Sequence, residues 1–127
     1  SFRSGKRPCG ANETFWLEQE ERMFAIFKKV IALGLLPVCG TDAGTGGTRF
    51  DETWLELALM VRRGCLSARE AIRIGTAQSA ACLGLTRETG AIGEGLSADL
   101  IALETDPITC IEALAHPARV MAQGRLV

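Results

Sequence analysis

Hydrophobic residues in the first two thirds of the chain recur at helical spacing. A long helix is predicted from Asn12 or Thr14 to the residues just before Gly34, which is placed to end it as a C-terminal cap. A second helix is predicted from a cap at Asp51 to a stop at Gly64. The predicted apolar faces comprise Trp16, Met23, Phe27, Val30 and Ile31 in the first helix, and Trp54, Leu55, Ala58, Leu59 and Val61 in the second.

Two shorter helices are predicted next. Ser67 and Glu70 have the spacing of a capping box, in which the serine hydroxyl accepts from the third helical amide and the glutamate accepts from the serine amide. This box predicts a short helix that ends near Gly75. Thr76 is then expected to cap another helix, with Gly84 just past its end.

The segments between and after the helices have the pattern of short strands. Residues 35–39 are apolar and stop abruptly at Gly-Thr-Asp, which is typical of a buried strand, and residues 40–50 form a glycine-rich loop. Strands are also predicted at residues 99–103, 119–122 and 125–127, the last two joined by a hairpin turn. The order helix, turn, strand, glycine loop, helix predicts the α/β class.

Composition narrows the class of protein. The 127 residues and 47% hydrophobic content suit one globular body with a real core. The net charge of −1 gives no electrostatic basis for binding nucleic acid or an anionic membrane. No stretch is apolar enough to span a bilayer or to serve as a signal peptide, so a soluble, cytoplasmic protein is expected. Five cysteines, an odd number without a Cys-x-x-Cys pair, favour free and mostly buried thiols.

Asp42 is the first candidate for chemistry, because it follows the apolar run at the start of the glycine loop. In α/β proteins, sites are built at the carboxyl ends of strands, where the loops vary while the strand fixes the side chain. A strand-end aspartate can bind a divalent cation or act as general base or acid toward a metal-bound water. The alternative is that Asp42 only caps a turn, and the loop taken by itself favours that interpretation.

Other chemistries fit this loop poorly. No Lys-Ser/Thr pair follows its glycines, and Arg49 stands where the last glycine of a dinucleotide-binding loop would be. Ala43 occupies the position after Asp42 where an aspartic protease needs a hydroxyl residue. Cys39 has no histidine partner to activate its thiol. His116, the only histidine, is expected at the surface in a turn.

An ordered set of short motifs runs from about Val38 to Val127. They are Val38–Gly44, Glu56-Leu57 with Val61 and Gly64, Glu70-Ala71, Thr76, Ala80-Ala81, Leu83–Leu85, Gly90–Ile92, Gly95, Ala98–Ile101, Asp106-Pro107 and Val120–Arg125. Their order and spacing resemble the carboxyl-terminal part of the amidohydrolase superfamily, closest to its imidazolonepropionase-like and prolidase-like branch. The first predicted helix fits the helix before the last barrel strand of that family.

In that family a (β/α)8 TIM barrel carries one or two divalent metals, and a small β-sandwich domain is assembled from both chain ends. The resemblance implies that residues 1–89 are the last barrel units and residues 90–127 part of the sandwich. It implies a metal-dependent hydrolase, with zinc, that cleaves amide or other carbon–nitrogen bonds in a small amide or dipeptide-like substrate. Asp42 would end the eighth strand, as metal ligand and as the group that takes a proton from the attacking water.

The chain departs from the family pattern in length and ligands. A whole barrel needs about 250 residues, a catalytic zinc takes three protein ligands, and the family's ligand histidines are absent. The chain is therefore expected to be a C-terminal fragment, inactive alone, that self-associates or docks to the missing barrel portion through exposed apolar faces. The alternative is a non-catalytic interaction module or degenerate fragment in which Asp42 only caps a turn.

Overall fold

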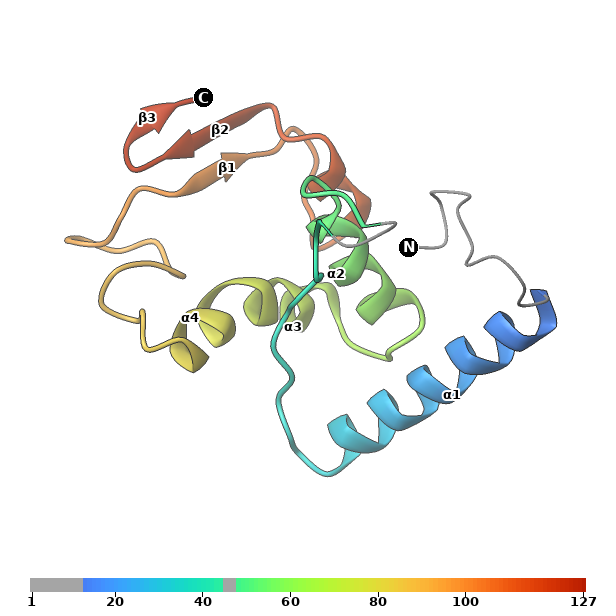
Figure 1. The fold of residues 1–127 in the computed structure, drawn as a ribbon. Coiled ribbons are helices and arrows are strands. Elements are labelled where there is room, and N and C mark those ends of the chain that lie inside the picture. The colour runs from blue at the N-terminus through green and yellow to red at the C-terminus, as the bar shows by residue number, and fades with distance from the viewer. Residues whose placement is uncertain (1–12, 45–47) are drawn as a thin grey trace.

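The computed structural model describes residues 13–44 and 48–127, a helical part followed by a small sheet (Figure 1). The helical elements are α1 (Glu13–Ala32), α2 (Thr53–Arg62), α3 (Ala68–Arg73), the π-helical turn η1 (Ile74–Gln78), α4 (Ser79–Cys82) and the 3₁₀ turn η2 (Ile111–Ala115). The strands are β1 (Leu100–Ala102), β2 (Arg119–Ala122) and β3 (Arg125–Leu126). The chain is thus mixed helix and strand. None of the helices in the described ranges has the length and apolar character needed to cross a membrane.

Glycines end α1 and α4 as predicted. Gly34 has a left-handed φ of +75°, and the amides of Gly34 and Leu35 donate to the carbonyls of Ile31 at 2.9 Å and Val30 at 3.2 Å. These two bonds define a Schellman cap, in which glycine is favoured because it has no Cβ to clash. Gly84, also at φ +75°, follows α4 with the same pair of bonds.

α1 projects away from the other helices (Figure 1), and side chains on one side of it contact the core. Phe27 and Ile31 pack against the core, as predicted. Phe24 is buried, whereas Met23, which was predicted to face the core, is 56% exposed. The prediction for Met23 is wrong because the contact stripe runs through Phe24, Phe27 and Ile31 at i, i+3, i+7 spacing. The guanidinium of Arg63 lies 5.0 Å from the centre of the Phe24 ring and extends this contact.

The core centres on α2, which packs on α3 and on η2. Its buried cluster comprises Leu57, Met60, Leu66, Ala71 and Ile74. Ala58 is the one member of the predicted α2 face that is buried. The other buried residues of α2 are Leu57 and Met60, so the side of the helix that faces the core differs from the predicted one. The other predicted positions on that face are half-buried, namely Trp54, Leu55, Leu59 and Val61.

Both ends of α2 differ from their predictions. The residue that precedes the helix is Glu52, without a side-chain cap bond, because Asp51 instead pairs with Arg49 at 2.8 Å. At the other end the left-handed φ lies at Cys65, so Gly64 is not a left-handed stop. A Cβ on Gly64 would lie 2.4 Å from the Met60 carbonyl oxygen and 2.6 Å from a Phe27 ring carbon. Glycine at position 64 therefore permits the close approach of α1.

The capping box before α3 is confirmed, but the break after it is not. The Glu70 amide donates to the Ser67 hydroxyl at 3.3 Å, and the Ser67 amide donates to Glu70 Oε2 at 2.7 Å. The helix then continues through η1 into α4, so it does not end near Gly75, and Thr76 caps nothing. Instead, Gly75 lies against the side chain of Leu57, where a Cβ would come within 3.0 Å. The π-helical turn η1 joins α3 to α4, so one continuous helical segment stands where two separate helices were predicted.

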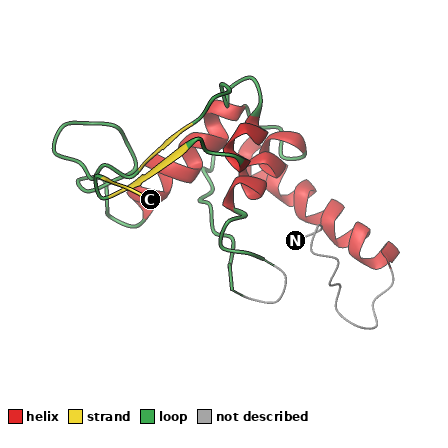
Figure 2. Ribbon diagram, turned by 90° about the horizontal axis from the view of Figure 1, so that it is seen from above, coloured by secondary structure: helices red, strands yellow, loops and turns green. Residues whose placement is uncertain are grey.

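The three predicted strands at the end of the chain are confirmed as an antiparallel sheet in the order β1-β2-β3. Leu100 pairs with Met121, and Met121 with Leu126. Gln123 and Gly124, at φ +50° and +78°, form the tight turn between β2 and β3. No residue of these strands is buried. The sheet lies to one side of α3 and α4 in Figure 1, and in the view from above its strands overlap part of the helices (Figure 2).

Candidate functional site

Residues 35–42 connect the end of α1 to the candidate site without regular secondary structure. The prediction of a buried strand at 35–39 is wrong, because a strand needs a neighbouring strand and the only sheet in the described ranges is β1-β2-β3. Leu35, Leu36 and Val38 are accordingly 57%, 58% and 43% exposed. The segment therefore presents apolar side chains to the surroundings on its way to Asp42.

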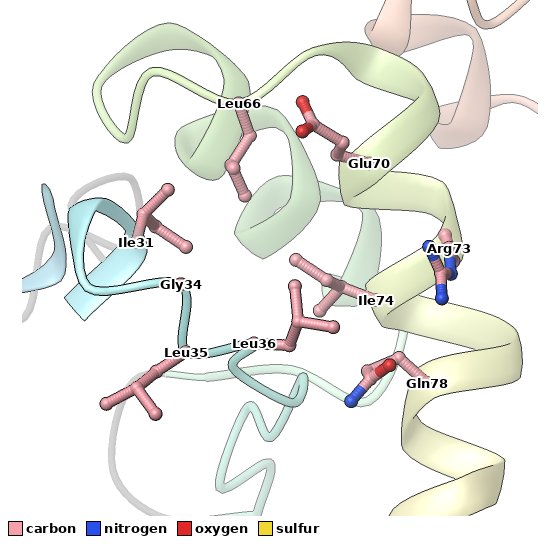
Figure 3. Close-up of a pocket in the computed structure, with 9 residues that line it drawn as sticks. All are labelled: Ile31, Gly34, Leu35, Leu36, Leu66, Glu70, Arg73, Ile74 and Gln78. Carbon is pink, nitrogen blue, oxygen red and sulfur yellow. The ribbon is translucent and has the colours of Figure 1, made fainter.

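A cavity of about 200 Å³ opens between this segment, the end of α1 and the helix α3–η1 (Figure 3). In the close-up Leu36 points toward Ile74, whereas Leu35 points away from both. Charged or polar side chains are contributed to the lining by Glu70, Arg73 and Gln78. Asp42 does not line this cavity, so the cavity is separate from the candidate catalytic residue.

Asp42 stands at the end of the extended segment with an exposed side chain. Its φ of +50° is in the left-handed region, which few residues other than glycine and asparagine or aspartate adopt. Gly44 follows at φ +95°, and its amide donates to the Thr48 carbonyl at 3.2 Å. Unusual backbone conformations of this kind are concentrated at functional sites. Asp42 is therefore an exposed carboxylate on a left-handed residue that follows the 35–41 segment.

Two side chains from distant parts of the chain bind the backbone just before this aspartate. The Cys39 amide donates to Ser79 Oγ at 3.2 Å, and the Gly40 amide donates to Glu56 Oε1 at 3.3 Å. The Ser79 hydroxyl in turn donates to the Ile74 carbonyl at 2.7 Å. Sequence reasoning missed both contacts, because Glu56 entered only as part of a family motif and Ser79 only as part of a predicted helix.

The Cys39 thiol is a poor nucleophile in this setting. Burial raises its pKa to about 12, and the negative charge of Glu56 acts in the same direction. This agrees with the absence of an activating partner in the sequence. The prediction of mostly buried thiols is wrong for the described cysteines, because the others lie at helix ends and are exposed, namely Cys65, Cys82 and Cys110. Cys9 lies outside the described residues.

The residues present do not fit a complete metal site. Residues 13–44 and 48–127 contain no group of three or more His, Cys, Asp or Glu side chains able to hold a metal ion. His116 is exposed at the end of η2, as predicted. A catalytic zinc normally takes three protein ligands, and Asp42 offers one. By itself this arrangement can supply a single carboxylate, as one ligand or as a proton acceptor.

Comparison with known proteins identifies the family. The sequence profile of the Amidohydrolase family matches residues 18–127, and the chain belongs to that family. Ochratoxinase from Aspergillus niger is 36% identical over 95 residues, which cover 74% of this chain and 19% of that protein. The chain therefore spans about a fifth of the length of the curated relative that it matches.

Solved structures agree with this assignment. A protein from Bifidobacterium longum proposed to be a prolidase matches with a TM-score of 0.78 and 38% identity, over 83% of this chain and 26% of that one. A Xaa-Pro dipeptidase with bound methionine in its active site matches with a TM-score of 0.74 and 33% identity, over 82% and 25%. The A. niger ochratoxinase structure gives a TM-score of 0.69 and 32% identity, over 81% and 24%. The predicted resemblance to prolidase-like amidohydrolases is confirmed.

Proposed function

We propose that the complete protein containing this chain is a metal-dependent hydrolase of amide or other carbon–nitrogen bonds. The observation that carries the proposal is the family match across residues 18–127, together with similarity to an ochratoxinase and a Xaa-Pro dipeptidase. The substrate class is a small molecule with an amide or dipeptide-like bond, because the second of these relatives is named for cleaving a dipeptide.

Asp42 has two roles in this proposal. It supplies one ligand to the divalent metal, with zinc as the proposed ion, and it accepts a proton from the attacking water. Its exposed carboxylate and left-handed backbone at the end of an extended segment support these roles. The remaining ligands must come from outside the described residues, so the chain alone is proposed to be inactive.

The proposed domain division places residues 1–89 in the last units of a (β/α)8 barrel and residues 90–127 in a composite β-sandwich. The sequence of α1, an extended segment and α2 supports the first assignment, with residues 35–42 in the place of the eighth strand. The change from helices to the antiparallel sheet β1-β2-β3 supports the second. Neither unit is complete within this chain.

The chain is also proposed to dock to the rest of the barrel or, failing that, to itself. Large apolar side chains are exposed on several elements, among them Ile26, Leu33, Leu35, Leu36, Val38, Leu100 and Ile101. Exposed apolar side chains in this number support binding to other protein surface. Light scattering that shows a stable monomer of the chain would count against this part of the proposal.

The test is to express a longer protein that continues the coding sequence upstream, beside the 127-residue chain. Both would be assayed against Xaa-Pro dipeptides and N-acyl amides, with and without a chelator and added zinc. We expect hydrolysis only by the longer protein, loss of activity with chelator, and a decrease of about 10²- to 10⁴-fold for Asp42→Ala. Asp42→Asn serves as the matched variant that keeps the side-chain size.

Each part of the proposal can fail separately. Full activity of Asp42→Ala in the longer protein would remove Asp42 from the reaction. Stoichiometric zinc binding and hydrolysis by the isolated chain would contradict the fragment interpretation. A longer protein that neither binds metal nor hydrolyses these substrates would favour the alternative, a non-catalytic module in which Asp42 only caps a turn.

A further inference from the structure

We infer that Glu56 and Ser79 are positioning residues that fix the backbone before Asp42 and so orient its carboxylate. This inference rests on the proposed function for its catalytic consequence, while its structural content is independent of it. Neither residue touches the reacting atoms in this arrangement. Each acts through one amide, Ser79 through that of Cys39 and Glu56 through that of Gly40.

The two bonds hold the segment from different elements. Glu56 lies on α2, 16 residues from its partner, and Ser79 begins α4, 40 residues from its partner. Because the consecutive amides at positions 39 and 40 bind side chains from two different elements, the segment is tied to both α2 and α4 just before Asp42.

Glu56 is half-buried, with one of its two carboxylate oxygens turned away from solvent. Its Oε1 accepts from Gly40, but Oε2 is buried without a hydrogen-bond partner. Burying a carboxylate oxygen without a partner is unfavourable, and an apolar residue beside the buried Met60 would avoid it. The cost is explained if the carboxylate is kept for its bond to the backbone of the site.

Ser79 reaches its partner because of the π-helical turn. Its hydroxyl donates to the Ile74 carbonyl, five positions earlier, and accepts from the Cys39 amide. Both capacities of the hydroxyl are thus used, and its direction is fixed. π-helical turns within α-helices occur frequently at functional sites. Here the turn places a hydroxyl against the segment that leads to Asp42.

The first arm of the test measures amide hydrogen exchange in the 127-residue chain by NMR. In Glu56→Ala we expect the Gly40 amide to exchange about 10-fold faster, while Glu56→Gln, which retains an acceptor oxygen, stays close to the original rate. Ser79→Ala should do the same to the Cys39 amide. Thr76→Ala is the matched control, because its hydroxyl binds the Ile72 carbonyl and does not contact residues 39–42.

The second arm uses the longer protein. If orientation of Asp42 is the role, Glu56→Ala and Ser79→Ala lower kcat by about 10- to 100-fold, the usual effect of removing a partner that orients a ligand. KM and the melting temperature stay near their original values, and Glu56→Gln restores most of kcat. A change in exchange without a change in kcat would overturn the positioning role, as would unchanged exchange of the Gly40 amide in Glu56→Ala.

The two proposals fail in different ways. A longer protein that does not hydrolyse any substrate overturns the proposed function, while the exchange rates still decide whether these side chains fix the backbone. If circular dichroism shows that Glu56→Ala does not fold, Ser79→Ala with the Cys39 amide decides in its place.

Discussion

The helices around α2 and the sheet β1-β2-β3 differ in how much apolar surface they bury. Around α2, Leu57 and Ile74 are 7% and 3% exposed and belong to one contiguous cluster. In the sheet, Leu100, Ile101 and Leu126 are 37%, 49% and 62% exposed, although its pairing and tight turn are regular. Local sequence rules are therefore enough to form the hairpin, but the sheet has no second layer within the described residues. The difference shows that the helices enclose a core, whereas the apolar side chains of the sheet stay largely exposed within the described residues.

The largest expected loss of stability comes from truncating a buried side chain in the core. Leu57→Ala should destabilise the chain by about 2–5 kcal/mol, because it leaves a cavity among buried neighbours. Leu100→Ala in the sheet should cost less than about 0.5 kcal/mol, the range for exposed positions. Urea unfolding of both variants measures the difference. Equal losses would show that the sheet is as well packed as the helices.

Thiol reactivity gives a second measure of where the core ends. At pH 8 the Cys39 thiol, with its pKa raised from 9.0 to about 12, should react roughly 10³-fold more slowly than a thiol of ordinary pKa. The exposed thiols of Cys65, Cys82 and Cys110 serve as internal controls. Labelling followed by mass spectrometry, with and without urea, assigns each rate. A fast Cys39 in the folded chain would mean that residues 35–42 detach from the helices.

Substitutions at Gly64 and Gly124 compare the stability cost of a steric clash with the cost of a left-handed backbone conformation. Gly64→Ala should cost about 3 kcal/mol, because its Cβ would meet a backbone oxygen that cannot easily move. Gly124→Ala in the hairpin should cost about 1 kcal/mol, since nothing lies within 4 Å and only its φ of +78° opposes a side chain. Thermal unfolding monitored by circular dichroism tests the order of the two. The reverse order would place the tighter constraint in the sheet.

The smallest expected effect concerns Asp99, which ties the start of β1 to the β2–β3 turn. Its Oδ1 accepts from the Gln123 amide at 2.8 Å, and this bond, followed by those to Ser97 and Thr89, lowers the pKa of the carboxyl below 3.8. Because the folded pKa is depressed, the stabilisation is present above pH 3.8 and is lost as the pH falls through the lower, folded value.

The measurement is the NMR shift of the Gln123 amide from pH 6 to pH 2. The shift should change with a midpoint below 3.8, and Asp99→Asn should abolish the change. The amide of Leu57, in the core, is the control and should not titrate with it. A midpoint at or above 3.8 would show that the bond to the turn does not favour the ionised carboxylate.

The sequence was sufficient where the determinants are local. The Ser67 box, the Gly34 and Gly84 caps and the β2–β3 turn each depend on a few neighbouring residues, so spacing alone predicts them. The same holds for the family resemblance, which rests on short motifs in order. Asp42 as ligand and proton acceptor stays a prediction.

Sequence reasoning failed where contacts between distant residues decide. Residues 35–39 have the composition of a strand, but the described part of the chain offers no strand beside them, and Asp51 pairs with Arg49 instead of capping α2. Glu56 binds an amide 16 residues away, and its role was hidden inside an otherwise apolar helix. These features follow from the path of the chain in space, which periodicity does not encode.

The π-helical turn η1 also has a consequence for how this segment tolerates change. Such a turn amounts to one residue inserted into an α-helix, and it rotates everything after it by about 100° relative to the helix before. Deleting one residue between Ile74 and Gln78 would therefore convert the π-helical turn into a regular α-helix. The deletion would also rotate Ser79 away from Cys39. A change within the helix would therefore break a hydrogen bond to a segment 40 residues earlier in the chain.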